Sequence, residues 1–233
     1  MFITLRLTLL TLLISLSLPV HSENWNVQSI LDRLIHTYGG EDKLRKLDNM
    51  TQEWDLVALM GNRHGTDTRI VRAPNQLKVN LSYPGKFETR ILDGDTAYVI
   101  FKDSPAKQVS GMQLDAMRLQ LMRLYSPLML RDKIESMNLT EQGELLALSL
   151  VEKGLHVHYL VNKETWRIEK VAGSLMMKGN EIKFLTEYSD FKTVEGVLMH
   201  HKENKFASGM NTAMLQLRQI TFPTDLDSST FKP

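Results

Sequence analysis

From residue 50 onward, most of the chain consists of short segments in which apolar and polar residues alternate. Turn signals such as Gly61-Asn62, Pro84-Gly85 and Asp93-Gly94-Asp95 separate these segments. Alternation with a period of two is typical of β-strands with one buried face, and the gaps have the length of hairpin turns. Within each run of strands no gap can hold a crossover helix, so the sheet should be antiparallel and meandering. The pattern predicts about eleven strands, near 51–60, 66–73, 76–83, 86–92, 96–102, 144–151, 155–162, 166–173, 180–189, 196–206 and 211–220.

Three segments have helical spacing instead. The first runs from Val27 to Tyr38 and stops at Gly39-Gly40, and a short helix is expected at 41–47. The third, residues 111–130, is called the Met-rich segment below. A sheet of so many strands curls, and its concave side needs a cover, which only these three segments can supply. The fold class is therefore mainly β with a few helices (α+β), with a large curved antiparallel sheet. The apolar stripe of the Met-rich segment is Leu114, Met117, Leu121 and Leu124.

The Met-rich segment admits two interpretations. Unbranched Met side chains adapt to apolar partners of irregular shape, and Ser126-Pro127 could act as a hinge, which favours a mobile lid over a ligand. As a lid it should expose Arg118, Gln120 and Arg123 to water. The other interpretation is an ordinary core helix that never moves. A curved sheet that is covered by helices can likewise enclose either a solid core or an apolar cavity.

The first 22 residues have the composition of a secretory signal peptide. Arg6 precedes an apolar run from Leu7 to Leu18, and Val20-x-Ser22 is an acceptable cleavage pattern. The run is shorter than the roughly 20 residues that span a bilayer, although an uncleaved anchor is the alternative. We therefore expect an exported, soluble protein in which residues 23–233 form a single domain.

Charge and cysteine content exclude several classes of partner and site. The signal segment holds one of the 28 basic residues and none of the 27 acidic ones, so the remainder carries no formal net charge. A neutral chain lacks the basic field that holds nucleic acid, and no nucleic-acid partner is expected. Because the chain has no Cys, disulfides and thiolate metal sites are impossible. We expect a monomer without cofactors.

No sequence motif for catalysis is present. The chain has no Gly-x-Ser-x-Gly elbow, phosphate loop, His-Glu-x-x-His or dinucleotide glycine pattern. His156-x-His158 and His200-His201 suggest a metal site, but too few ligands are certain to converge, so no metal is expected. The prediction is a binding protein rather than an enzyme. An enzyme remains the alternative, since carboxylate pairs leave no local signature.

Several turn motifs together resemble one family. Tyr188-Ser-Asp-Phe191, the turn at Gly196-Val197, and a tail from Asp225 to Phe231 resemble the C-terminal part of LolA-like periplasmic proteins. Tyr38-Gly39-Gly40 and the hairpin at Asp93-Gly94-Asp95 match the family more loosely. The resemblance implies an unclosed antiparallel half-barrel capped by helices, with an apolar cavity for lipid acyl chains. It gives no position for the buried arginine that ties the lid to the sheet in lipoprotein carriers.

This resemblance implies a periplasmic chaperone that carries lipids or lipoproteins to the outer membrane. Its partners would be lipid acyl chains or lipoproteins, together with inner- and outer-membrane transport proteins. The alternative is a lipid-sensing regulatory or interaction module without transport, and a solid-cored structural domain is a third possibility. No catalytic residue is predicted. The predicted cavity and lid residues are Leu114, Met117, Leu121, Leu124, Leu31, Leu34, Ile35, Leu56, Val157, Tyr159, Ile168, Phe184 and Leu215.

Overall fold

The computed structural model describes residues 25–102, 104–177 and 179–233, so the expected signal peptide lies outside the described residues. Thirteen strands form one antiparallel sheet in the order β6-β5-β4-β3-β2-β1-β13-β12-β11-β10-β9-β8-β7. The strands are β1 (Asn49–Ala58), β2 (Arg63–Arg72), β3 (Gln76–Tyr83), β4 (Lys86–Asp93), β5 (Thr96–Phe101), β6 (Lys107–Val109), β7 (Met137–Gln142), β8 (Leu145–Glu152), β9 (Leu155–Asn162), β10 (Ile168–Met177), β11 (Asn180–Val194), β12 (Val197–Ala207) and β13 (Met210–Thr221).

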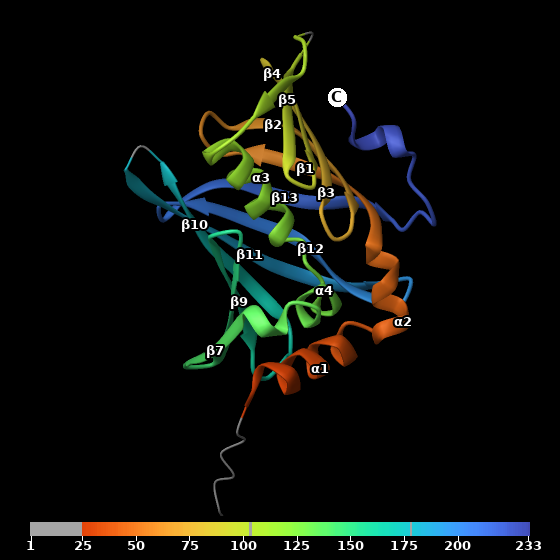
Figure 1. Cartoon of the computed structure of the whole chain (residues 1–233), viewed down its shortest axis with the longest axis vertical. Coiled ribbons are helices and arrows are strands. Elements are labelled where there is room, and N and C mark those ends of the chain that lie inside the picture. The colour runs from red at the N-terminus through yellow and green to blue at the C-terminus, as the bar shows by residue number, and fades with distance from the viewer. Residues whose placement is uncertain (1–24, 103, 178) are drawn as a thin grey trace, which may run out of the picture.

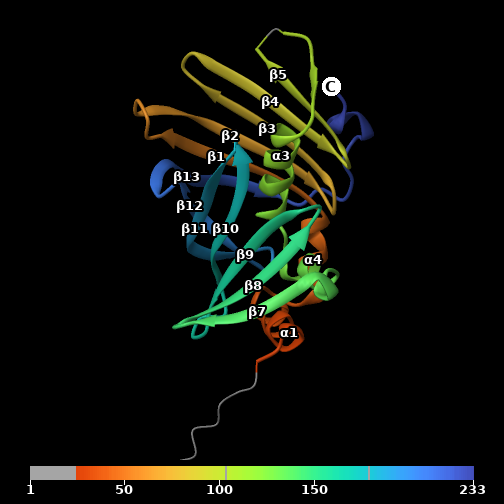
Figure 2. The same ribbon diagram turned by 60° about the vertical axis from the view of Figure 1, so that its left-hand side comes forward.

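The strand order explains why the sheet does not close. The chain builds β1 to β6 outward, crosses to the far edge, and returns from β7 to β13, which pairs with β1. The edges are thus β6 and β7, each paired on one side. Figures 1 and 2 show the resulting half-barrel. The predicted fold class is confirmed, and the sequence missed only the two edge strands. β6 has three residues, and β7 is mostly polar, so neither carries a clear buried alternation.

Short helices cover the concave face of the sheet. They are α1 (Val27–Thr37), α2 (Glu41–Leu44), α3 (Met112–Met122) and α4 (Pro127–Arg131), with 3-10 turns η1 (Arg45–Asp48), η2 (Ile134–Ser136) and η3 (Ser228–Phe231). In both views α3 runs inside the curved sheet, while α4 lies beside α1 and α2. The Met-rich segment is therefore two helices joined by residues 123–126. Among the described residues, no helix is long and apolar enough to cross a membrane.

Two of the family-like motifs meet where α1 docks on the sheet. The backbone amide of Leu198 donates to the Tyr38 carbonyl at 3.1 Å, and the amide of Ile168 donates to the Tyr38 hydroxyl at 3.0 Å. Gly39 has a φ of +117°, and a Cβ there would lie 2.1 Å from the carbonyl oxygen of Gly196. Glycine is therefore required where the helix end touches the turn between β11 and β12.

Candidate functional site

A small apolar cavity lies between the connection from α3 to α4 and the concave face of the sheet. Its volume is about 60 Å³. An engineered protein cavity of about 150 Å³ holds one benzene molecule, so this space is too small for an acyl chain. The described conformation is therefore closed. We call this space the central cavity; its lining includes Leu47, Met50, Leu124, Tyr125, Tyr159, Ile168, Val171, Tyr188, Leu198 and Met199 from the apolar and aromatic residues, and Gln52, Arg123 and His200 from the polar ones.

Two tyrosines of the sheet fasten the end of α3. The Tyr159 hydroxyl donates to the Met122 carbonyl at 2.8 Å, and the Tyr188 hydroxyl donates to the Arg123 carbonyl at 2.9 Å. Carbonyls at the end of a helix have no partner within the helix, so these two hydrogen bonds satisfy groups that would otherwise be buried without one. Burial of the Tyr188 ring raises the pKa of its hydroxyl, which therefore stays a donor at neutral pH. We call this pair the tyrosine clasp.

Removing the tyrosine clasp should loosen α3. Tyr159→Phe and Tyr188→Phe should each lower the free energy of unfolding by about 1–2 kcal/mol, because each leaves a buried carbonyl without a donor. Amide hydrogen exchange in α3 should become faster in both variants. Tyr83→Phe is the matched control, since the Tyr83 ring lies over Arg63 and Lys86 at the end of β3 and packs against the apolar cluster around Trp54. Unchanged exchange in α3 would show that the hydrogen bonds do not hold the helix.

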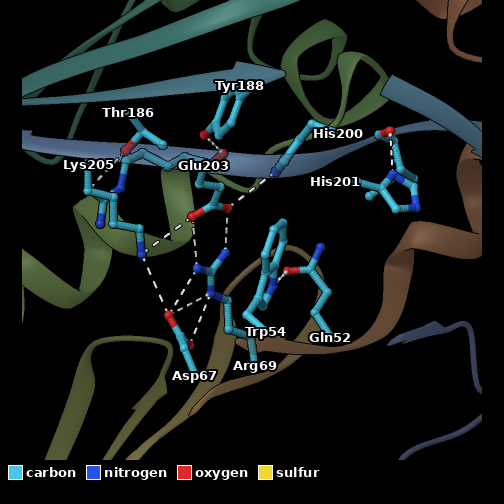
Figure 3. Close-up of polar contacts among 12 residues, drawn as sticks. Gln52, Trp54, Asp67, Arg69, Thr186, Tyr188, His200, His201, Glu203 and Lys205 are labelled. Carbon is cyan, nitrogen blue, oxygen red and sulfur yellow. Dashed lines mark hydrogen bonds and ion pairs between the residues drawn. The ribbon is translucent and has the colours of Figure 1, made fainter. Parts of the chain in front are cut away.

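Beneath the lid, four charged side chains form a buried network that we call the quartet (Figure 3). The Arg69 guanidinium donates to both oxygens of Glu203, at 2.7 and 2.9 Å, and to Asp67 at 3.0 Å. The Lys205 ammonium lies 3.4 Å from Glu203 and 3.6 Å from Asp67. Arg69, Asp67 and Glu203 are each no more than 2% exposed. Two cations face two carboxylates, so the quartet is neutral.

The quartet joins two halves of the sheet across its concave side. Arg69 lies on β2 and Glu203 on β12, and β1 and β13 lie between them. In a flat sheet, strands three places apart are about 14 Å from each other, so the direct ion pair requires strong curvature here. The Trp54 ring of β1 lies under the Arg69 guanidinium, 4.9 Å away, and heads a second apolar cluster with Leu56, Leu215 and Leu217.

The quartet shifts the pKa values of its members. Although burial opposes the effect, the charges of Arg69 and Lys205 hold the pKa of Glu203 well below its ordinary value. Burial, aided by the charge of Arg69, lowers the pKa of the Lys205 ammonium to about 8. Glu203 and Asp67 oppose this shift but do not cancel it.

The lowered pKa of Lys205 predicts a rise of stability at alkaline pH. Above pH 8 the native state loses the Lys205 proton, while the unfolded chain keeps it up to about 10.5. Because the unfolded state then binds more protons, the free energy of unfolding should rise with pH, by about 1 kcal/mol between pH 8 and pH 9. Urea denaturation should show this rise in the wild type and not in Lys205→Met. Lys170→Met, which removes a partly exposed partner of Glu187, should keep it.

His200 joins the quartet to the central cavity. Its Nε2 atom lies 3.2 Å from a Glu203 oxygen, and its ring stacks on Tyr188 with centroids 4.1 Å apart and on Trp54 at 5.7 Å. The neighbouring His201 contacts the Met199 carbonyl instead. His156 is exposed, and His158 contacts the Ser149 hydroxyl on the outer face. Across the three described ranges, no three His, Asp or Glu side chains are placed to hold one metal ion.

The structure brings only some of the predicted ligand-binding residues together. Leu124, Tyr159 and Ile168 line the central cavity. Leu121 lines a neighbouring side pocket of about 230 Å³, which shares the Tyr125 ring with the central cavity. Leu56 and Leu215 lie in the second cluster under Arg69, and Phe184 borders an outer groove of about 680 Å³ between β9 and β12. The others are part of the main core around the helices: Leu31, Leu34, Ile35, Leu114, Met117 and Val157.

The prediction that Arg118, Gln120 and Arg123 face water is wrong for Gln120, whereas Arg118 and Arg123 are both half-buried. Gln120 is 8% exposed and its side chain accepts from Arg90 at 3.5 Å, while Arg123 lines the central cavity. Arg118 lies nearer the surface, where it pairs with Asp95 and Asp115. The reason is tertiary. α3 lies inside a trough, so the sheet surrounds more of its circumference than the single stripe of a surface helix would bury.

Sequence reasoning missed the quartet, the tyrosine clasp and the position of Arg123. Arg69 and Glu203 are 134 residues apart and carry no local motif. The available signal was a charged residue at inward positions of alternating strands. In β2, Asp67 and Arg69 occupy the same face as Val71, and a strictly apolar inner face would not contain them.

Comparisons with solved structures reveal the same architecture in several proteins. The LolA superfamily protein NE2245 from Nitrosomonas europaea matches with a TM-score of 0.57 and 14% identity over 90% of this chain and 98% of that chain. A putative outer membrane lipoprotein-sorting protein domain from Vibrio parahaemolyticus gives 0.55 and 12% over 89% and 97%. A DUF1329 family protein from Desulfovibrio piger gives 0.56 and 12% over 88% and 97%.

The likeness is one of fold, because the sequences have diverged widely. No protein-family model matches the chain, and no curated protein matches its sequence. The solved structures nevertheless align over 88–90% of this chain with TM-scores of 0.55–0.57. The chain therefore has the LolA-like fold, an unclosed antiparallel half-barrel with helices inside its concave face.

Proposed function

We propose that this protein is a periplasmic carrier that binds the acyl chains of lipids or lipoproteins between α3–α4 and the sheet. The observation that carries the proposal is an apolar, aromatic-lined cavity under a helical segment whose end is held to the sheet by the tyrosine clasp. The LolA-like fold supports it, and one structure of this fold is described as an outer membrane lipoprotein-sorting domain. Binding of this kind needs no catalytic group.

Loading requires the lid to move. The central cavity and the side pocket together fall short of a long acyl chain, and the Tyr125 ring is their common wall. An outward displacement of α3 would open both. Burial of each methylene group contributes about 0.8 kcal/mol, so a chain of moderate length can offset the cost of breaking the tyrosine clasp. If α3 were docked rigidly, the bound lipid could not be released. The two hydrogen bonds of the tyrosine clasp hold α3 closed and can still be broken when the lipid leaves.

Met side chains support this adaptable role. Met117 and Met122 of α3 and Met129 of α4 are all buried in the core. Their unbranched side chains can repack around an inserted chain more readily than branched ones. Substituting Asp for both Met117 and Leu121 should abolish acyl-chain binding, because two carboxylates would enter the apolar interior.

Mass spectrometry of protein purified natively from a periplasmic extract tests the proposal. Co-purification of lipid or lipoprotein, and its loss in the double variant Met117→Asp/Leu121→Asp, is the expected result. Transfer of the bound lipid to acceptor vesicles would mark a carrier, whereas retention together with a change in affinity for a protein partner would mark a lipid sensor. Absence of bound lipid, and no uptake of added acyl chains, would refute the binding function.

A further inference from the structure

Arg123 holds a half-buried positive charge at the border between the central cavity and the quartet. Its side chain lines the central cavity and also a narrow gap of about 10 Å³ above Arg69, Glu203 and Lys205. Its one hydrogen bond in the described ranges is a long one, 3.5 Å from Nη1 to the Thr186 hydroxyl. No ion pair of Arg123 within 4.0 Å is found there either. A guanidinium has five N–H donors, so most of its capacity is unused.

The charge of Arg123 is not balanced by its surroundings. The quartet is already neutral, because Arg69 and Lys205 face Asp67 and Glu203. Partial burial lowers the pKa of Arg123. A guanidinium nevertheless stays protonated in proteins. Charges that line apolar surroundings are normally paired, so an anion that reached Arg123 would supply the counter-charge that its guanidinium lacks.

We propose that Arg123 binds the head group of an amphiphile whose acyl chain ends in an anionic oxygen group, a carboxylate or a phosphate. This inference rests on the proposed function and names the class of ligand. The planar fork of N–H donors matches both anions in a two-point contact. Leu124, Tyr159 and Ile168 line the same cavity, so a chain attached to that head group would enter apolar surroundings directly.

The position of Arg123 also links a bound head group to α3. Arg123 lies at the C-terminal end of α3, and the Tyr188 hydroxyl donates to its backbone carbonyl at 2.9 Å. When the lid moves, the head-group contact therefore moves with it, while the chain remains on the sheet side. A ligand that pairs with Arg123 would close the lid over its own chain.

Isothermal titration calorimetry with dodecanoate, dodecyl phosphate, methyl dodecanoate and acetate tests the inference. The wild type should bind dodecanoate and dodecyl phosphate more tightly than the uncharged ester by about thirty-fold or more, the effect of leaving a buried charge unpaired. Arg123→Gln should lose this preference and bind the ester unchanged, while Arg123→Lys should keep part of it. Arg131→Gln is the matched control, because Arg131 lies in the same segment but already pairs with Glu41.

Three outcomes would overturn the inference, and a fourth would refute the proposed carrier function on which the inference rests. Equal affinity for the ester and the anions, or an unchanged preference in Arg123→Gln, would show that Arg123 does not bind the head group. Acetate binding as tightly as dodecanoate would mean a site for a free anion. No binding of any acyl compound would refute the carrier itself.

Thermal unfolding of the ligand-free protein gives a readout that does not depend on binding. If Arg123 is kept for a ligand, Arg123→Gln should melt at the same temperature as the wild type or higher, because a half-buried charge without an ion pair is removed. A marked fall in melting temperature would show that Arg123 supports the fold, and the preference seen in binding would then need another cause.

Discussion

Replacing Arg69 with alanine should lower the free energy of unfolding by about 3–5 kcal/mol, because Asp67 and Glu203 would remain buried without their main partner. Both carboxylates are 2% exposed or less, and Arg69 donates to each of them. Truncation would also remove the guanidinium above the Trp54 ring. Equilibrium urea denaturation measures the change. The loss should exceed that of either tyrosine clasp variant, in which only one neutral hydrogen bond is removed.

A surface ion pair is the appropriate control. Arg218 pairs with Asp55, and both side chains are more than half exposed, so Arg218→Ala should cost less than about 1 kcal/mol. The neutral quadruple variant Asp67→Asn, Arg69→Met, Glu203→Gln and Lys205→Met should regain much of the lost stability, since none of the four charges of the quartet then stays buried without a partner. If Arg69→Ala costs no more than Arg218→Ala, the quartet does not hold the two halves of the sheet together.

Locking α3 to the sheet should abolish uptake of acyl chains. A Cβ at Gly173 of β10 would lie 2.7 Å from the Cδ1 atom of Leu119, so cysteines at these two positions face one another directly. The chain contains no other cysteine, which makes the pair Leu119→Cys/Gly173→Cys free of competing thiols. In the oxidised form, binding of dodecanoate should be undetectable by calorimetry, because the closed central cavity has room for neither chain nor head group. Reduction should restore binding.

A second disulfide controls for effects other than closure. Ser174 and Lys183 are paired on adjacent strands and face away from the helices, so Ser174→Cys/Lys183→Cys should cross-link β10 to β11 without touching the lid. This variant should bind equally well oxidised and reduced. Full binding by the oxidised Leu119–Gly173 variant would mean that ligand enters without movement of α3, and the lid would be an ordinary core helix.

These two experiments address different parts of one arrangement. The quartet joins β2 to β12 where the curved sheet brings them together, and the central cavity lies beside it under the connection of α3 and α4. His200 contacts both, through Glu203 and through the Tyr188 ring. Loss of the quartet should therefore weaken ligand binding as well as stability, whereas locking the lid should affect binding alone.

Much of the architecture could be predicted from local patterns. The alternation of residues such as Leu155, Val157, Tyr159 and Val161 predicted strands that the structure contains, and hairpin turns predicted their antiparallel order. The edge strands escaped because an edge is held by backbone pairing and needs no apolar alternation. The helical stripe of residues 27–38 was correct, since its buried residues are those that the period of 3.6 selects.

The candidate site was predicted less well, for a physical reason. The alternation of apolar and polar residues predicts that Leu56 and Leu215 face inward. It cannot predict that the ion pair of Arg69 and Glu203 separates them from the cavity. The helical pattern of the Met-rich segment likewise gave a wet face to Gln120 and Arg123. Whether a helix face is exposed to solvent depends on the elements that surround the helix. The local periodicity of the sequence contains no information about those elements.

The sequence by itself determined most of the strands, the helices and the nearly neutral, cysteine-free character of the chain, because each of these follows from composition or from the period of neighbouring residues. The tertiary structure alone decided which charges meet. Arg69 reaches Glu203 because the sheet curls, and Arg123 turns inward because α3 lies in the trough that this curl creates. Burial then makes the first charge a structural support and leaves the second without a counter-charge at the edge of an apolar cavity.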